Sequence, residues 1–401
     1  MKSNAVTRSS EQPATDHAAA EGDKPPPLAA AAAYARAAAR VCHACAKPPP
    51  GAPHGVVVLY SETDKLGSAA PKDIAVDLET IAIAKAVAGV LEQHTDLRVH
   101  LVPALRHVER VLAPFPPEDY LVFNLFEGVD GVVPEDGNDL LDEEARAALT
   151  LEALGYRYTG ADGRALALSV NKAYAKAALV RGGVLTPAWR VFARADEVTS
   201  ASVSGLHFPV IVKPVAEDSS LGIDANAVVS DLDALRTRVA QVTTCYQQPA
   251  LAEEFIAGRE FNVGIWGAPP QVLPLAEVDL SALGAPEKHI VTYAAKWEEG
   301  SFEYEHTPVT CPAVVSEALA ARIRSTALRA WSIAGSRSGY GRVDMRVYGK
   351  RCYVLEVNPN PSIAADAGLA RAARAAGLDY AQMILRVLSQ ARGTTPQDSP
   401  I

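Results

Sequence analysis

The sequence lacks several features that would assign a protein to a class at once. No run of about 18 uncharged apolar residues occurs, so no membrane-spanning helix is expected. The N-terminus has no positively charged region followed by an apolar stretch and a cleavage site, so we predict a cytoplasmic protein rather than a secreted one. No dense run of Lys and Arg occurs, and the net charge is −9. Nucleic acid is therefore not an expected partner.

Cysteine is scarce, and its spacing fits no known type of site. The chain has five cysteines, of which only Cys42 and Cys45 lie close together. A zinc site would need two further ligands at matching spacing, and the sequence offers no second pair. The pattern favours free cysteines in a reducing compartment. Two catalytic motifs are also missing, namely the Gly-x-Ser-x-Gly turn of many hydrolases and the Gly-x-x-x-x-Gly-Lys loop of Walker A proteins.

The composition is that of a globular protein with more than one domain. The chain has 401 residues, of which 49% are hydrophobic and 21% charged, and this length accommodates two or three domains. A Pro-rich and Ala-rich extension over residues 1–52 is predicted to be disordered or helical. Beyond it, changes in sequence pattern divide the chain into units at residues 53–160, 161–250 and 251–395.

The first of these units alternates between predicted strands and helices. Val56–Tyr60 and Tyr120–Asn124 are apolar runs of the buried-strand type, and residues 74–93 between them have helical spacing. Such alternation predicts an α/β domain with a parallel sheet, whose ligands bind near the carboxyl ends of the strands.

Three oxygen-bearing side chains fall on a predicted hairpin in the last unit. Asp344 lies on one apolar strand, Glu356 and Asn358 lie on the next, and a Tyr-Gly-Lys turn at 348–350 joins them. Because residues two apart in a strand point to the same face, Glu356 and Asn358 should lie together. Their oxygen atoms suit Mg²⁺, which fills its remaining positions with water and phosphate oxygens. A solvated strand face is the alternative, but the apolar flanking residues favour the metal site.

Cationic side chains occur where phosphate groups could bind. Lys213 ends a predicted strand over residues 208–214 and precedes a Ser/Gly loop that contains Ser219 and Ser220. A lysine at this point can reach nucleotide phosphates while N–H groups of the loop surround them. Lys172 begins a predicted helix, and a surface lysine is an equally good interpretation of that position.

A further set of residues could complete a nucleotide site. Residues 253–256 are predicted to form a strand edge whose backbone could bind an adenine ring. This segment consists of Glu253, Glu254, Phe255 and Ile256. Glu260 could accept hydrogen bonds from ribose hydroxyls, and Lys296 and Arg342 would add positive charge near the predicted metal site.

Taken in chain order, these segments resemble the ATP-grasp ligases, and most closely the D-alanine–D-alanine ligase family. The resemblance covers roughly residues 55–390 and rests on nine short motifs in the family's order. They are Val122-Phe123-Asn124, Tyr158-Thr159-Gly160, Asn171-Lys172, Ile211-Val212-Lys213-Pro214, Ser219-Ser220-Leu221-Gly222, Glu260-Phe261, Ala295-Lys296-Trp297, Gly341-Arg342-Val343-Asp344 and Leu355-Glu356-Val357-Asn358.

The resemblance implies an ATP-grasp fold, which is α+β, preceded by an α/β domain with a parallel sheet. Residues 53–160 would form this substrate domain, and 161–250 and 251–395 would form the central and C-terminal ATP-grasp subdomains, the last with the metal site. ATP and two Mg²⁺ ions, which Mn²⁺ could replace, would be the cofactors. The partners would be a small-molecule carboxylate, a small-molecule amine and a second copy of the chain in a homodimer.

The resemblance also implies a role for each candidate residue. Lys172 and Lys213 would hold ATP phosphates, with Ser219 and Ser220 in the loop that closes over them. Residues 253–256 would line the adenine pocket, and Glu260 would bind ribose. Asp344, Glu356 and Asn358 would bind the two Mg²⁺ ions. The catalytic residues would be Ser219, Lys296 and Arg342, with Lys296 reaching the γ-phosphate from a mobile loop and Arg342 stabilising the acyl phosphate and the tetrahedral intermediate.

The regions expected to bind the amino-acid substrates differ from the family's pattern. The N-terminal family signature is missing from the segment Leu59–Gly67, and Glu127-Gly128 stands where the family has His-Gly. The family's Ser-Pro-Gly-Met stretch is replaced by Asn360-Pro361-Ser362-Ile363. The serine that binds the carboxylate of the second substrate is replaced by Ala367, and a glycine of the phosphate loop is replaced by Asp218. We therefore expect a product other than D-alanyl-D-alanine.

Three functions are consistent with these observations. The first is an ATP-dependent ligase that joins a carboxylate to an amine through an acyl phosphate, with amino acids, or a small carboxylate and an amino acid, as substrates. The second is a genuine D-alanine–D-alanine ligase of cell-wall synthesis. The third is an ATP-binding module without turnover, which would have no need of Arg342 or Lys296 beside the metal site.

Overall fold

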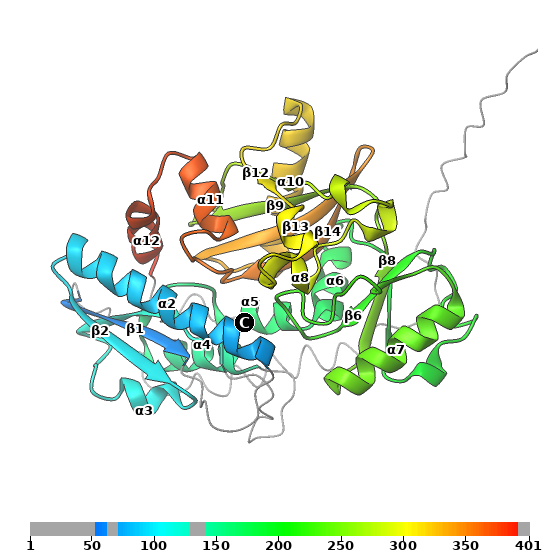
Figure 1. Ribbon diagram of the computed structural model, residues 1–401. Coiled ribbons are helices and arrows are strands. Elements are labelled where there is room, and N and C mark those ends of the chain that lie inside the picture. Colours follow the sequence, from blue (N-terminus) through cyan, green and yellow to red (C-terminus); the bar gives the residue numbers. More distant parts are fainter. Residues whose placement is uncertain (1–52, 62–70, 129–141, 392–401) are drawn as a thin grey trace, which may run out of the picture.

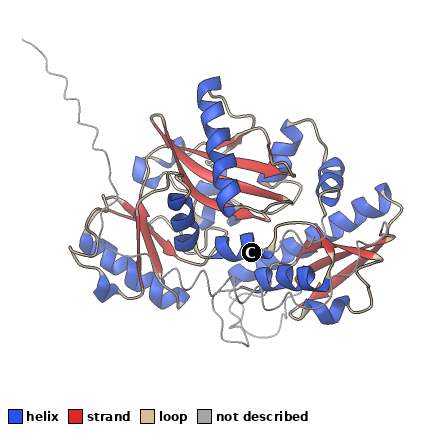
Figure 2. Ribbon diagram, turned by 180° about the vertical axis from the view of Figure 1, so that it is seen from behind, coloured by secondary structure: helices blue, strands red, loops and turns tan. Residues whose placement is uncertain are grey.

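Three β-sheets with helices packed on them make up the described part of the chain (Figure 1, Figure 2). The computed structural model describes residues 53–61, 71–128 and 142–391. The predicted extension over residues 1–52 lies outside these residues.

The first sheet is parallel, as the alternating pattern predicts. Its strand order is β2-β1-β3-β4. Val56 and Val58 of β1 pack in one core with helices α2 (Pro71–His94) and α12 (Tyr380–Leu388). Val57 and Leu59 pack in another core with α3 (Val108–Leu112) and α4 (Glu143–Leu154). Both faces of the sheet are therefore covered, which explains why the strand is a continuous apolar run. The elements are β1 (Gly55–Ser61), α2 (Pro71–His94), β2 (Arg98–Ala104), α3 (Val108–Leu112), β3 (Tyr120–Leu125), α4 (Glu143–Leu154) and β4 (Arg157–Tyr158).

The second sheet is antiparallel, and helix α7 covers one of its faces. Its strand order is β5-β8-β6-β7. Leu235 and Val239 of α7 pack on Val212 and Ala252 of the sheet. The elements are β5 (Trp189–Phe192), a 3-10 turn η1 (Ala195–Glu197), β6 (Val210–Pro214), β7 (Val228–Val229), α7 (Leu232–Tyr246) and β8 (Ala250–Glu254).

The third sheet is also antiparallel and carries the predicted hairpin. Its strand order is β12-β11-β9-β13-β14, and β10 pairs with β9. Ile323, Ala327 and Trp331 of α10 pack on one face. The strands are β9 (Arg259–Trp266), β10 (Gln271–Val272), β11 (Ala276–Val278), β12 (Val309–Thr310), β13 (Tyr340–Tyr348) and β14 (Arg351–Pro359). The other elements are η2 (Ser281–Leu283), η3 (Pro286–Lys288), α8 (Tyr293–Trp297), α9 (Phe302–Glu305), α10 (Glu317–Ala334), α11 (Gly368–Ala375) and α12 (Tyr380–Leu388).

The predicted hairpin is confirmed as β13 and β14. Tyr348 pairs with Arg351, so Gly349 and Lys350 form the two-residue turn. Gly349 has a φ of 58°, a left-handed conformation that hairpin turns of this length require and that glycine adopts without strain. The pairing aligns Asp344 with Glu356 across the two strands.

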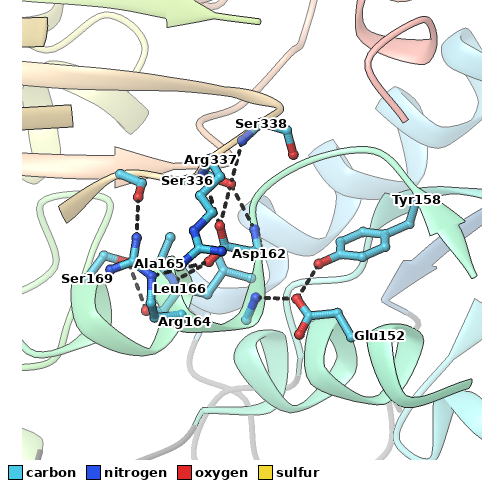
Figure 3. A network of polar contacts seen from close by, with 12 residues as sticks. Glu152, Tyr158, Asp162, Arg164, Ala165, Leu166, Ser169, Ser336, Arg337 and Ser338 are labelled. Carbon is cyan, nitrogen blue, oxygen red and sulfur yellow. Dashed lines mark hydrogen bonds and ion pairs between the residues drawn. The ribbon is translucent and has the colours of Figure 1, made fainter. Parts of the chain in front are cut away.

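A polar network joins the first sheet to the start of β13 (Figure 3). Asp162 caps α5 (Gly163–Val170) by accepting the N–H of Ala165 at 2.8 Å. Its other oxygen accepts the hydroxyl of Ser336 and the N–H of Arg337, both at 3.0 Å. On the other side, Glu152 of α4 accepts the hydroxyl of Tyr158 at 2.7 Å. Helix α5 and the loop before β13 are therefore held together through side-chain hydrogen bonds.

Candidate active site

The three predicted metal ligands lie together on the hairpin. Asn358 Nδ2 donates to Asp344 Oδ2 at 2.8 Å and to Glu356 Oε1 at 3.2 Å. Asp344 is 6% exposed. Burial raises the pKa of its carboxyl, and the Arg342 guanidinium opposes this rise. Two carboxylates and an amide thus converge at one point of the third sheet.

Four cations act electrostatically on Glu356. Desolvation alone would raise the pKa of its carboxyl, but these cations hold the pKa well below its usual range. They are Lys172, Lys213, Lys296 and Arg342. They come from α6 (Lys172–Arg181), β6, α8 and β13. The structure therefore brings together the cations that the sequence placed in one site, although they lie up to 170 positions apart in the chain.

Arg342 and Asn262 hold Asp344 in place. Arg342 donates from Nε to Oδ1 at 2.7 Å and from Nη2 to Oδ2 at 2.8 Å. Such a two-point contact fixes the plane of both groups. Asn262 pairs with Asp344 across β9 and β13, and its Nδ2 donates to Oδ1 at 2.7 Å. Asn262 was not predicted from the sequence, although it lies only two residues beyond Glu260 on the same strand.

A buried cluster of charges supports the phosphate-binding side of the site. Glu253 is 2% exposed, and its two oxygens lie 2.6 Å from the ammonium groups of Lys176 and Lys213. Burial would raise the pKa of Glu253, but the two lysines lower it to about 2. Lys176 also donates to Thr186 Oγ1 at 2.7 Å. Lys176 was missed in the sequence, although it lies one helical turn after Lys172.

The prediction that residues 253–256 form an exposed strand edge is wrong for Glu253 and Glu254. Strand β8 ends at Glu254 and pairs with β5 on one side and β6 on the other. The N–H groups of Glu254 and Phe255 donate to Ala188 O and Pro209 O. Backbone groups in an interior strand are already paired, so they cannot bind a ligand. An adenine pocket at this segment would have to use the backbone beyond Phe255.

Arg346 occupies the region predicted for the base and the ribose. It pairs with Glu260 across β9 and β13, and its Nη2 donates to Glu260 Oε2 at 2.8 Å. Its Nη1 donates to Ile256 O at 2.9 Å, and its guanidinium lies 4.9 Å from the centre of the Phe255 ring. Arg346 was also missed in the sequence, and it links the two segments predicted to bind the nucleoside.

The predicted phosphate loop is joined to the segment that carries Lys296. Trp297 Nε1 donates to Ser219 O at 3.1 Å, and Ser220 Oγ donates to Val291 O at 3.1 Å. Ser219 and Ser220 both have positive φ values, of 48° and 64°. Residues other than glycine adopt this backbone conformation at a cost in free energy, so the contacts around the loop must stabilise it. The ammonium of Lys172 lies against Glu217 O at the start of the same loop.

Comparison with known proteins identifies the family. The family model of the D-Ala D-Ala ligase C-terminus matches residues 180–389. The uncharacterised protein y4sG of Sinorhizobium fredii is 32% identical, over 72% of this chain and 80% of its own. A D-alanine–D-alanine ligase of Bordetella petrii is 32% identical over 60% of this chain and 70% of its own. One of Moorella thermoacetica is 30% identical over 77% and 92%.

Solved structures agree with this assignment at the level of the fold. The structure of D-alanine–D-alanine ligase from Bacillus anthracis complexed with ATP has a TM-score of 0.61 and 19% identity, and it covers 84% of this chain and 97% of its own. The expected ATP-grasp fold with an N-terminal parallel sheet is thereby confirmed. The chain belongs to the D-alanine–D-alanine ligase family of ATP-grasp enzymes.

Proposed function

We propose that the protein is an ATP-dependent carboxylate–amine ligase that forms an amide bond through an acyl phosphate. The observation that carries this proposal is the convergence of four cations on Glu356, beside a second carboxylate. A site that collects this much positive charge around paired carboxylates suits a nucleotide triphosphate with divalent cations. The substrates are amino acids, or a small carboxylate and an amino acid.

The donor set on the hairpin fits Mg²⁺. Asp344 and Glu356 face each other on neighbouring strands, where their like charges repel and a divalent cation would relieve the repulsion. Asn358 would be the third ligand through Oδ1, because its Nδ2 already donates to both carboxylates. When bound, two Mg²⁺ ions, or Mn²⁺ in their place, supply positive charge to the phosphate oxygens.

The residues around this site suit the two chemical steps. A carboxylate oxygen of the substrate attacks the γ-phosphorus of ATP and ADP leaves, which gives an acyl phosphate. An amine nitrogen then attacks the acyl carbon, inorganic phosphate leaves and the nitrogen gives up a proton. Negative charge develops in both steps, and Arg342 and Lys296 are placed to stabilise it. The contact between Trp297 and Ser219 helps to exclude water, which would hydrolyse the acyl phosphate.

The remaining candidate residues would hold the nucleotide. Lys172 and Lys213 bind phosphate groups, and Ser219 and Ser220 belong to the loop over them. Ile256 lies where the backbone leaves β8 and can face an adenine ring. Glu260 would bind the ribose through Oε1, because Arg346 donates both of its hydrogen bonds to Oε2.

A genuine D-alanine–D-alanine ligase is the second candidate, because relatives from Bordetella and Moorella carry that name. D-alanine-dependent ADP release would support it, and its absence at high D-alanine concentration would exclude it. A third candidate, an ATP-binding module without turnover, predicts tight ATP binding and no ligation with any substrate.

Other expectations also stay proposals. They are the domain limits 53–160, 161–250 and 251–395, a homodimer, a cytoplasmic location and the lack of a nucleic-acid partner. Among the described residues, no helix combines the length and apolar character needed to cross a membrane.

The test is an ADP-release screen over pairs of D- and L-amino acids and small carboxylates, with mass spectrometry of the products. The proposal predicts an amide whose formation matches ADP in a one-to-one ratio. If no pair releases ADP while ATP still binds, the protein is not a ligase.

A further inference from the structure

A fully buried lysine on α6 takes no part in the chemical steps described above. Lys176 is 1% exposed, so almost none of its surface is open to a ligand. Lysine is rarely buried to this extent unless a partner compensates its charge. Burial lowers the pKa of the Lys176 ammonium, and the neighbouring carboxylate of Glu253 opposes this change. The reason for a charge at this position must therefore lie in the groups around it.

The carboxylate of Glu253 is shared between two lysines. Its Oε2 lies 2.6 Å from Lys176 Nζ, and its Oε1 lies 2.6 Å from Lys213 Nζ. Lys176 also donates to the hydroxyl of Thr186 at 2.7 Å, and this group is neutral. The three charged groups thus carry two positive charges and one negative charge, which leaves a surplus of one positive charge in the interior.

Glu356 does not cancel this surplus. It acts on Lys176 and Lys213 electrostatically, but it is also the carboxylate on which Lys172, Lys296 and Arg342 act. Its single negative charge is therefore divided among several cations. The surplus at Glu253 remains directed at the phosphate side of the site.

A surplus charge in the interior is unfavourable for folding. Transfer of an ion from water to a protein interior carries a desolvation penalty, which is repaid only when a counter-charge is close. Without Lys176, Glu253 and Lys213 would form a simple one-to-one pair with no charge left over. The second lysine is thus explained by what the surplus does for a ligand rather than by stability.

Lys213 is the member of the cluster that a ligand can reach. It lies near the end of β6, shortly before the loop that contains Ser219 and Ser220, and its side chain is 8% exposed. If Lys213 alone faced Glu253, the carboxylate would neutralise it and leave little attraction for a second anion. Because Lys176 takes half of that interaction, the Lys213 ammonium keeps positive charge for a phosphate.

We propose that Lys176 is a positioning residue for nucleotide phosphates, which acts through Glu253 and leaves Lys213 with net positive charge toward the ligand. The inference rests on the nucleotide site of the proposed ligase function. Lys176 does not touch the nucleotide. Its effect is confined to the phosphate groups of a nucleoside diphosphate or triphosphate and does not extend to the base or the sugar.

The test compares ADP with adenosine on wild type and Lys176→Met, in buffer that contains Mg²⁺. The carboxylate between the two lysines places Lys176 about 8–10 Å from a phosphate on Lys213, and at an effective dielectric constant of about 20–40 its charge changes binding about five- to twentyfold. The dissociation constant for ADP, measured by calorimetry, should rise by this factor. That for adenosine, measured by ligand-observed NMR, should stay within about twofold. An equal loss for both ligands, or no loss for ADP, would overturn the inference.

A double variant separates charge from shape. Lys176→Met combined with Glu253→Gln leaves Lys213 beside a neutral amide, so the surplus of one positive charge returns although both neighbours have changed. ADP binding should recover to within about threefold of wild type, because about one unit of charge again faces the phosphate. A double variant that binds ADP no better than Lys176→Met would contradict the proposal.

Thermal unfolding gives a readout of opposite sign. Lys176→Met should melt at the wild-type temperature or above it, because the variant removes a surplus buried charge and leaves Glu253 paired. A fall of more than about 4 °C would show that Lys176 supports the fold instead. Arg181→Met is the matched control, since Arg181 ends the same helix and is exposed. It should bind both ligands as wild type does.

Failure of this inference is distinguishable from failure of the ligase proposal. If ATP binds but no substrate pair releases ADP, the ligase proposal fails, and weaker ADP binding by Lys176→Met still supports the role of Lys176. If wild type binds ADP no more tightly than adenosine, Lys213 does not hold phosphate and the inference is wrong, whether or not the protein is a ligase.

Discussion

The buried charge cluster at Glu253 leads to a quantitative prediction. Glu253→Gln keeps the shape of the side chain but leaves the ammonium groups of Lys176 and Lys213, each 2.6 Å away, without their shared counter-charge. The pKa of Glu253 falls from 4.5 to about 2 in the folded protein, and a shift of this size corresponds to about 3 kcal/mol of stability at neutral pH. Removal of one partner from a buried ion pair costs a similar amount, about 3–5 kcal/mol.

The pH dependence of this effect has a definite sign. Because the pKa of Glu253 is depressed on folding, its contribution is complete above the unfolded value of 4.5 and is lost as the pH falls toward 2. The difference in unfolding free energy between wild type and Glu253→Gln should therefore be about 3 kcal/mol at pH 7 and about 2 kcal/mol at pH 3.5. Urea unfolding followed by tryptophan fluorescence measures both values.

The next residue along β8 provides the control. Glu254 contacts the ring of His207 at 2.6 Å, and that histidine side chain is 68% exposed. Exposed pairs contribute little, so Glu254→Gln should cost less than about 1 kcal/mol at pH 7. Equal losses for the two variants, or a loss for Glu253→Gln that does not shrink at acidic pH, would refute the reasoning.

Three further predictions concern turnover. Arg342→Ala should lower kcat about 100- to 1,000-fold in steady-state assays and change the KM for ATP far less, because its stabilisation acts on charge that develops in the transition state; a loss confined to ATP affinity would contradict this. Glu356→Gln should abolish ADP release by removing a metal ligand, and wild-type rates in the variant would disprove that role. Trp297→Phe removes the hydrogen bond to Ser219, worth about 1 kcal/mol, and should release ADP in excess of amide as water enters; a one-to-one ratio of ADP to amide would show that this contact does not exclude water.

The parts of the fold and the site that could be predicted from the sequence have local signals. Val56–Tyr60 is a strand because its own residues are apolar and β-branched, and the hairpin follows from two such runs around Gly349. Glu356 and Asn358 share a face because alternation along a strand is a property of the backbone itself. These features can be predicted without knowing which other segments pack against them.

The residues that were missed depend on partners far away in the chain. Arg346 meets Glu260 and Ile256 only because β9 and β13 pair, across separations of 86 and 90 positions. The strand edge at Glu253 was predicted wrongly for the same reason, since the order β5-β8-β6 places two partners beside β8. Lys176 is different, because its position four residues after Lys172 puts both lysines on one helix face, and this spacing could have identified it.

The hydrogen bonds around Asp162 have a consequence for the order in which substrates bind. They tie helix α5 to the loop that leads into β13, and Asn360 ties the end of β14 to Ala161 and Glu144. The distance between the carboxyl edge of the first sheet and Arg342 is thus set by hydrogen bonds within the protein and does not depend on bound nucleotide. We expect the carboxylate substrate to find its place already formed in the free enzyme, so that it and ATP can arrive in either order.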